Sequence, residues 1–130
     1  MGEALDPEVV ELAGKIFDLA RAGDTDTLAA YIDAGVPVNL TNDSGDSLVM
    51  LAAYHGHASA VRVLVERGAD VDRANDRGQT PLAGAVFKGA DDVVRALVDG
   101  GADPAAGTPS AIDTARMFDK GELLTLFGAA

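Results

Sequence analysis

The histidines in Tyr54-His55-Gly56-His57 are the residues of this sequence best suited to metal binding or proton transfer. A His-x-His pair can ligate a metal ion when both rings project from one strand. Here a glycine separates the rings, and glycine is typical of a helix end, where it adopts a left-handed conformation without strain. The two rings would then point apart. A metal-dependent enzyme centred on His55 and His57 is therefore the weakest of three functional hypotheses, and we expect no metal site.

The acidic segment Asn42-Asp43-Ser44-Gly45-Asp46 has some of the features of a calcium-binding loop. Such a loop needs a bidentate Glu at its twelfth position, which is Ala53 when counted from Asn42. A turn is therefore the better interpretation. The sequence also has no Cys, no phosphate-binding loop with a Lys and no serine in a nucleophile elbow. We expect no catalytic residue and no cofactor, and predict that the protein is not an enzyme.

The charge of the chain argues against several classes of partner. Ten Lys and Arg stand against 21 Asp and Glu, which gives a formal net charge of -11. Nucleic-acid phosphates and anionic membranes repel such a chain, so we expect neither as a partner. No apolar run is long enough to span a bilayer, and the acidic first thirty residues do not form a signal peptide. The default expectation is a cytoplasmic protein.

The elements that carry these residues repeat along the chain. Gly23, Gly56 and Gly89 are spaced 33 residues apart, and so are Gly35, Gly68 and Gly101. Each period predicts two helices that end at these glycines, followed by a turn rich in Asp, Asn and Gly. Thr80 and Pro81 are a typical start for the first helix of a period. The predicted repeats are 7–41, 42–74, 75–106 and 107–130, which together form one domain over residues 1–130.

The repeat also carries a family resemblance. Residues 75–106 contain Gly78-Gln79-Thr80-Pro81-Leu82, Gly89 and Gly101-Ala102-Asp103, and this pattern closely resembles the ankyrin repeat. The resemblance implies an all-α solenoid of stacked helix-turn-helix units with short hairpin loops, here as a small stand-alone domain. It also implies a non-enzymatic module that binds a protein partner on its concave face. It assigns His57 a structural role in hydrogen bonding, and places His55 on the exposed surface.

The two end repeats depart from the pattern. Asp6-Pro7-Glu8 starts a longer amphipathic helix that runs through Val9, Leu12, Ile16 and Phe17. The last repeat is offset by 30 residues instead of 33, which predicts a loop shortened by three residues around 105–109. Its apolar residues would close the stack: Leu123, Leu124, Leu126 and Phe127. Altered terminal repeats are the usual way of capping such a core.

The resemblance, carried over residue by residue, defines candidate partner-binding positions on the hairpin tips and just before the glycines that end the first helices. The tip positions are Asp43, Asp46, Asp76, Arg77 and Gln79. The helix positions are Tyr54, His55, Phe87, Lys88, Met117 and Phe118.

Three of the chain's six aromatic residues, Tyr54, Phe87 and Phe118, fall at these exposed positions. Aromatic and Met side chains are enriched as anchors of protein interfaces. The competing interpretation is that Tyr54 and Phe87 tuck between helices and support packing. An alternative function is an acidic inhibitor or decoy that occupies a basic, possibly nucleic-acid-binding, site by charge mimicry. We expect a monomer in either case.

Overall fold

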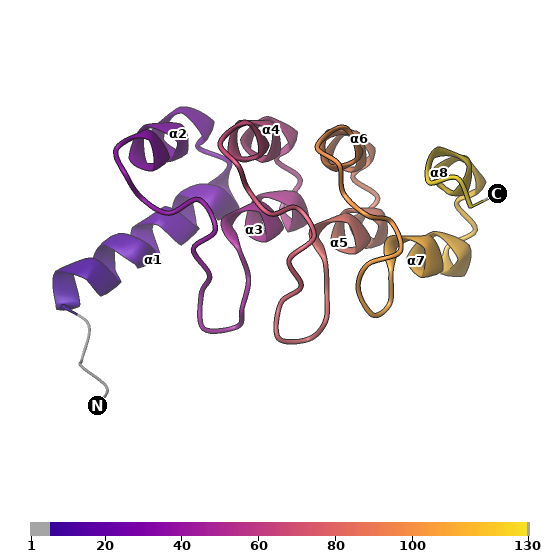
Figure 1. Cartoon of the computed structure of the whole chain (residues 1–130), viewed down its shortest axis with the longest axis horizontal. Coiled ribbons are helices and arrows are strands. Elements are labelled where there is room, and N and C mark those ends of the chain that lie inside the picture. Colours follow the sequence, from indigo (N-terminus) through magenta and orange to yellow (C-terminus); the bar gives the residue numbers. More distant parts are fainter. Residues whose placement is uncertain (1–5, 130) are drawn as a thin grey trace.

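The computed structural model describes residues 6–129, which form four helix pairs stacked side by side (Figure 1). One layer holds the inner helices α1, α3, α5 and α7, and the other holds the outer helices α2, α4, α6 and α8. Hairpin loops project from the inner layer between successive pairs. The predicted all-α repeat architecture is confirmed. The helices are α1 (Pro7–Ala22), α2 (Thr25–Asp33), α3 (Leu48–Tyr54), α4 (Ala58–Glu66), α5 (Pro81–Lys88), α6 (Asp91–Asp99), α7 (Ala111–Met117) and α8 (Gly121–Leu126).

Three inner helices begin in the same way. A hydroxyl group precedes each helix and accepts a hydrogen bond from the backbone N–H three residues later. The acceptors are Ser47 for α3, at 3.1 Å, Thr80 for α5, at 3.3 Å, and Ser110 for α7, at 3.0 Å. All three capping residues are buried, and each hydroxyl satisfies a backbone donor that has no partner within the helix.

The inner helices also end alike. Gly23 after α1 and Gly89 after α5 take left-handed φ values of 72° and 70°. In the last repeat Asp119, with φ of 56°, stands where the other repeats have glycine. Asp tolerates this conformation better than most residues with a side chain. The turn that closes the last inner helix therefore survives without glycine.

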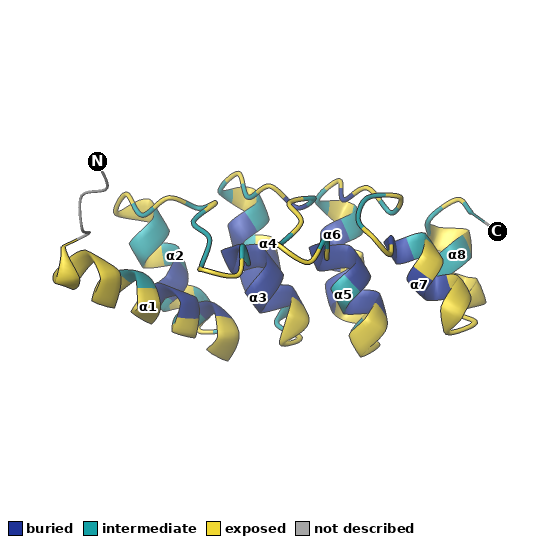
Figure 2. Cartoon of the chain, turned by 90° about the horizontal axis from the view of Figure 1, so that it is seen from below, coloured by how far each residue is buried: buried dark blue, intermediate teal, exposed yellow. Residues whose placement is uncertain are grey.

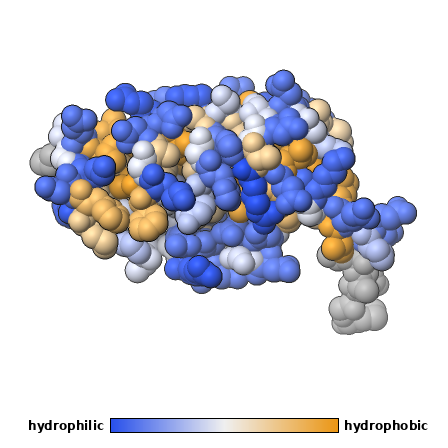
Figure 3. Space-filling view, turned by 180° about the vertical axis from the view of Figure 1, so that it is seen from behind, coloured by the Kyte–Doolittle hydropathy of each residue, from blue (hydrophilic) through white to orange (hydrophobic). Residues whose placement is uncertain are grey.

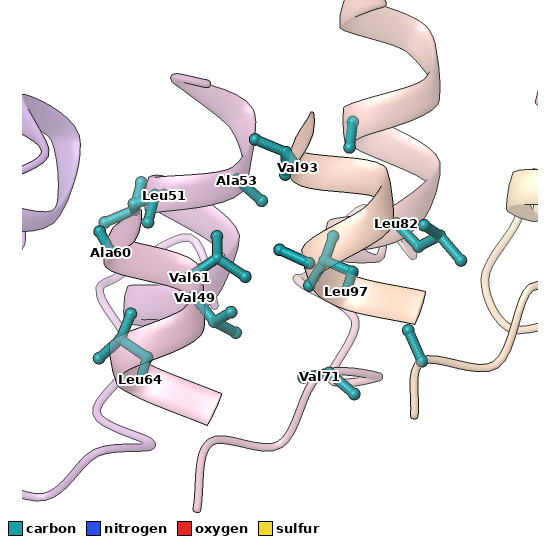
Figure 4. Close-up of a cluster of buried hydrophobic side chains, with 14 of the residues drawn as sticks. Val49, Leu51, Ala53, Ala60, Val61, Leu64, Val71, Leu82, Val93 and Leu97 are labelled. Carbon is teal, nitrogen blue, oxygen red and sulfur yellow. The ribbon is translucent and has the colours of Figure 1, made fainter. Parts of the chain in front are cut away.

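The core is one continuous band of apolar side chains between the two layers (Figures 2 and 4). Val61, Leu64, Leu82, Val93 and Leu97 are fully or almost fully buried within it. They come from the inner helix α5 and the outer helices α4 and α6. The stack is therefore stabilised by apolar side chains buried between the two layers and between neighbouring helices of one layer. No single helix pair encloses this band, which is why the repeats stabilise one another.

Polar contacts tie neighbouring repeats together outside the core. Asn39 accepts a hydrogen bond from the backbone N–H of Asp70 at 2.8 Å, and 33 residues later Asp72 does the same for Asp103 at 2.7 Å. On the outer layer, Arg67 donates two hydrogen bonds to Asp33, at 2.9 and 3.1 Å. This ion pair lowers the pKa of the Asp33 carboxyl from its usual value. Equivalent bonds at equivalent positions fix the register of the stack.

The longer first helix through Val9, Leu12, Ile16 and Phe17 is confirmed, whereas the prediction that Leu126 closes the stack is wrong. Val9 and Leu12 lie on this helix but are 54% and 41% exposed. Helix α1 is 16 residues long and α3 is seven, so the first half of α1 extends beyond the helix that would cover it. Leu126 is likewise 42% exposed, whereas Leu123, Leu124 and Phe127 pack against the core.

Replacing the fully buried Leu64 with Ala should lower the free energy of unfolding by about 2–5 kcal/mol, because it leaves a cavity between the layers. Urea titration followed by circular dichroism measures this loss. Leu126→Ala, which removes the same atoms from an exposed site, should change stability by less than about 0.5 kcal/mol. A loss below about 1 kcal/mol for Leu64→Ala would contradict the proposed core.

Candidate functional site

The predicted helix positions lie together on one edge of the molecule. The exposed ends of the inner helices line up along this edge (Figure 2). Tyr54 is 38% exposed, Phe87 60%, Phe118 43% and Met117 68%. We call these four residues the aromatic stripe. Seen from behind, apolar surface gathers over the C-terminal repeats, and a second apolar area lies at the N-terminal helix (Figure 3).

The side chains of the aromatic stripe touch one another and their neighbours across repeats. The rings of Phe87 and Phe118 meet edge to face, with their centroids 5.7 Å apart. The ammonium group of Lys88 lies 4.7 Å from the centre of the Tyr54 ring, within range of a cation–π interaction. Each contact joins two successive repeats: the first lies within the aromatic stripe, and the second joins Tyr54 to Lys88 beside it.

An apolar groove of about 260 Å³ runs beside the aromatic stripe. It crosses three repeats, because its walls come from α3, α5, α7 and the loops before α5 and α7. At its floor Gly84 leaves room that a side chain would fill: a Cβ atom there would lie 3.5 Å from Met50 and 3.7 Å from Tyr54. The lining residues are Met50, Tyr54, Gln79, Ala83, Gly84, Phe87, Pro109, Thr114, Met117 and Phe118.

An acidic cavity of about 390 Å³ adjoins the groove, between the first two hairpin loops and α3. The two hollows share Met50, Tyr54 and Gln79 as walls. The cavity brings together all five predicted tip residues, with Asp43, Asp46 and Asp76 outnumbering Arg77 in charge. Its lining residues are Asp43, Ser44, Asp46, Met50, Leu51, Tyr54, Asn75, Asp76, Arg77 and Gln79.

Some tip residues also have structural roles that the sequence did not reveal. Asn75 donates a hydrogen bond to Asp46 at 2.8 Å and another to Gln79 at 2.9 Å. The side-chain oxygen of Asn75 accepts hydrogen bonds from two backbone N–H groups in its own loop. The side-chain oxygen of Asn42 does the same one repeat earlier. Asn75 therefore joins the two loops. Asp43, Asp76 and Arg77 remain exposed at the tips.

The two histidines play different roles, as the sequence analysis predicted. His57 Nε2 donates a hydrogen bond to the backbone carbonyl of Arg21 at 2.7 Å and so links the first two inner helices. His55 lies on the surface with its ring edge-on to Tyr54 at 5.6 Å. Burial lowers the pKa of His55, and the positive charges of His57, Arg21 and Lys88 lower it further. The lowered pKa favours the uncharged form of the His55 imidazole.

The part of the chain that the structure describes shows no cluster of three or more metal-ligating side chains. Within residues 6–129, no helix has both the length and the apolar composition to cross a membrane. The chemistry of the site is thus that of a surface with aromatic, apolar and acidic side chains.

This stack of helix pairs with projecting hairpin loops is the architecture of a repeat protein. Comparison with known proteins identifies its family. The family model described as ankyrin repeats in three copies matches residues 16–107. The chain therefore belongs to the ankyrin-repeat family, as the sequence resemblance implied. Ankyrin repeats are generally non-enzymatic protein–protein interaction modules.

Two known proteins are similar to the chain. Ankyrin repeat protein PA3287 of Pseudomonas aeruginosa is 51% identical over 59 residues, which cover 45% of this chain and 34% of that protein. The matched region thus spans only a third of the relative's length. The crystal structure of the human ASB11 ankyrin repeat domain superposes with a TM-score of 0.65 and 31% identity, covering 68% of this chain and 40% of that one.

The contact between His57 and Gly23 can be tested with two glycines of matched backbone geometry. A Cβ atom at Gly23 would lie 2.4 Å from the His57 ring, whereas one at Gly89 would meet nothing within 4 Å. Both positions have nearly the same left-handed φ, so Gly89→Ala should cost only the backbone strain, about 1–2 kcal/mol. Gly23→Ala should cost clearly more in urea titration. Equal losses would show that His57 does not clamp the first two repeats.

Proposed function

We propose that the chain binds a protein partner through the aromatic stripe and the adjoining groove. The observation that carries this proposal is that four exposed side chains, Tyr54, Phe87, Met117 and Phe118, line one hollow whose walls are mainly apolar. Exposed aromatic and Met side chains contribute most to the free energy of binding when a partner buries them. Their exposure also favours a binding role over the packing role that the sequence left open.

The rest of the chain supports the proposal by keeping this surface in place. The inner helices that carry the aromatic stripe rest on a fully buried core and begin at buried caps. A preformed surface loses little conformational entropy when it binds. The proposed activity therefore needs no catalytic group, cofactor or metal. A monomer acting in the cytoplasm remains the expectation from the sequence.

The acidic alternative is favoured by one observation, the carboxylates gathered in the acidic cavity. An inhibitor or decoy that acts by charge alone would bind through Asp43, Asp46 and Asp76 and lose affinity steeply as salt rises. Binding through the aromatic stripe would persist in salt, because apolar burial is not screened. The salt dependence of binding thus separates the two functions.

Truncation of the aromatic stripe should remove partner binding. In affinity capture from a lysate of the source organism at high salt, wild type should retain a protein that Tyr54→Ala/Phe87→Ala loses. The control Val9→Ala/Leu126→Ala removes two exposed apolar side chains that do not line the groove and should retain the protein. Circular dichroism and urea titration verify folding. Retention by the Tyr54/Phe87 variant together with a large loss of stability would establish the packing role instead.

A variant that fills the groove tests the same proposal without removing any aromatic ring. Gly84 has no left-handed φ and a Cβ atom there meets only ordinary contacts, so Gly84→Leu should remain folded, which urea titration verifies. Its side chain would occupy the groove and should abolish capture of the partner. Gly84→Ala is the control and should reduce capture less. Full capture by a folded Gly84→Leu protein would show that the groove is not the binding site.

A further inference from the structure

The apolar groove and the acidic cavity form one bipartite site. The two hollows share Met50, Tyr54 and Gln79 as walls. A single ligand can therefore extend from one hollow into the other. We propose that the occupant is a linear segment of a protein partner that carries one Lys or Arg beside large apolar side chains. The basic group would lie in the acidic cavity and the apolar side chains in the groove. This inference rests on the proposed function and specifies the chemistry of the partner.

Charge complementarity is the first argument for a basic group in the acidic cavity. Asp43, Asp46 and Asp76 line it against the single Arg77. Among residues 6–129, the ion pairs involve other carboxylates, those of Asp18, Asp33, Glu66 and Asp99. Asp43, Asp46 and Asp76 are thus in no ion pair among the described residues, and Arg77 can offset only one of their three charges.

The wall between the two hollows suits the stem of a basic side chain. The ammonium group of Lys88 lies 4.7 Å from the centre of the Tyr54 ring, so a cation can be placed within cation–π range of this wall. Met50 adds a polarisable apolar surface on the same wall. Lys and Arg bury their methylene stems against such surfaces while their charged ends reach polar groups. A ligand cation would thus be held by carboxylates at its end and by apolar atoms along its stem.

The stacking of repeats sets the spacing within the ligand. The acidic cavity lies between the second and third repeats, and the groove extends to the fourth through Thr114, Met117 and Phe118. Adjacent helices pack roughly 8–10 Å apart, and an extended chain advances about 3.3 Å per residue. The basic residue should therefore lie about three positions from the apolar residue that enters the groove.

Other occupants are disfavoured by the same charges. Nucleic-acid phosphates would meet three carboxylates at the acidic cavity. A second copy of this chain carries a net charge of -11 and would be repelled overall. A basic and apolar peptide segment is attracted by both halves of the site.

The experiment selects peptides from a phage-displayed library of random dodecapeptides on the immobilised wild-type chain, with Gly84→Leu as the counter-selection target. Enriched peptides should share a Lys or Arg about three positions from Leu, Ile, Met or Phe. In fluorescence anisotropy, changing the basic residue of an enriched peptide to Gln should weaken its binding about tenfold. Asp43→Asn/Asp76→Asn in the protein should do the same.

The control is Asp26→Asn/Glu122→Gln, which changes the net charge equally on the outer helices and should leave peptide affinity unchanged. Peptides that need Phe87 but carry no basic residue would overturn this inference and leave the proposed function standing. Peptides that need Asp43 and Asp76 but not Phe87 would overturn the bipartite site. If no peptide is enriched, the inference is wrong, whereas a partner captured through Tyr54 and Phe87 would still support the proposed function.

Discussion

The close approach of the inner helices is the constraint on which the rest of the structure depends. Ala52, Ala85 and Ala115 stand at equivalent places in three successive inner helices, and all three are completely buried. A side chain of one carbon lets the helices approach closely at these points, where a larger residue would force them apart. Each alanine lies two residues before an exposed side chain, namely Tyr54, Phe87 or Met117. The separation of the exposed side chains is thus set by the smallest residues of the core.

Folding and the proposed recognition depend on different residues of the same helices. The hydroxyl caps, the buried alanines and the leucines of the outer layer fix the backbone, and none of them belongs to the exposed edge. The tips are an exception, because Asp46 and Gln79 hydrogen-bond to Asn75 and also line the acidic cavity. Substitutions at Phe87 or Met117 should therefore alter recognition with little effect on folding, whereas those at Asp46 would affect both.

Most of the fold could be predicted from the sequence because the same pattern of residues recurs in successive repeats. Glycine spacing located the ends of the helices, and Thr80-Pro81 located the start of α5. The sequence did not show that Val9 and Leu12 are exposed, because helical apolar spacing indicates which face of a helix is apolar but not how far the neighbouring helix covers that face. The end residue Leu126 was misplaced for the same reason.

The candidate site was predicted in part. The residues that the family places on the surface are on one edge, as expected, but the groove was not foreseen. Gly84 and Met50 did not indicate a groove in the sequence, because a glycine inside a helix and a methionine in an apolar run are typical of ordinary core positions. A hollow arises from several repeats at once, and no single period of the sequence encodes it. The linking role of Asn75 likewise required the two loops to be seen together.

The shortened third loop makes the two ends of the binding edge unequal. From α3 to α5 the repeat advances 33 residues, and from α5 to α7 only 30, so the last hairpin projects less than the other two (Figure 1). The surface is consequently walled near the N-terminal repeats and open towards the C-terminal one. A chain lying along this edge would have a preferred direction of exit, past α7, where the hairpin projects least.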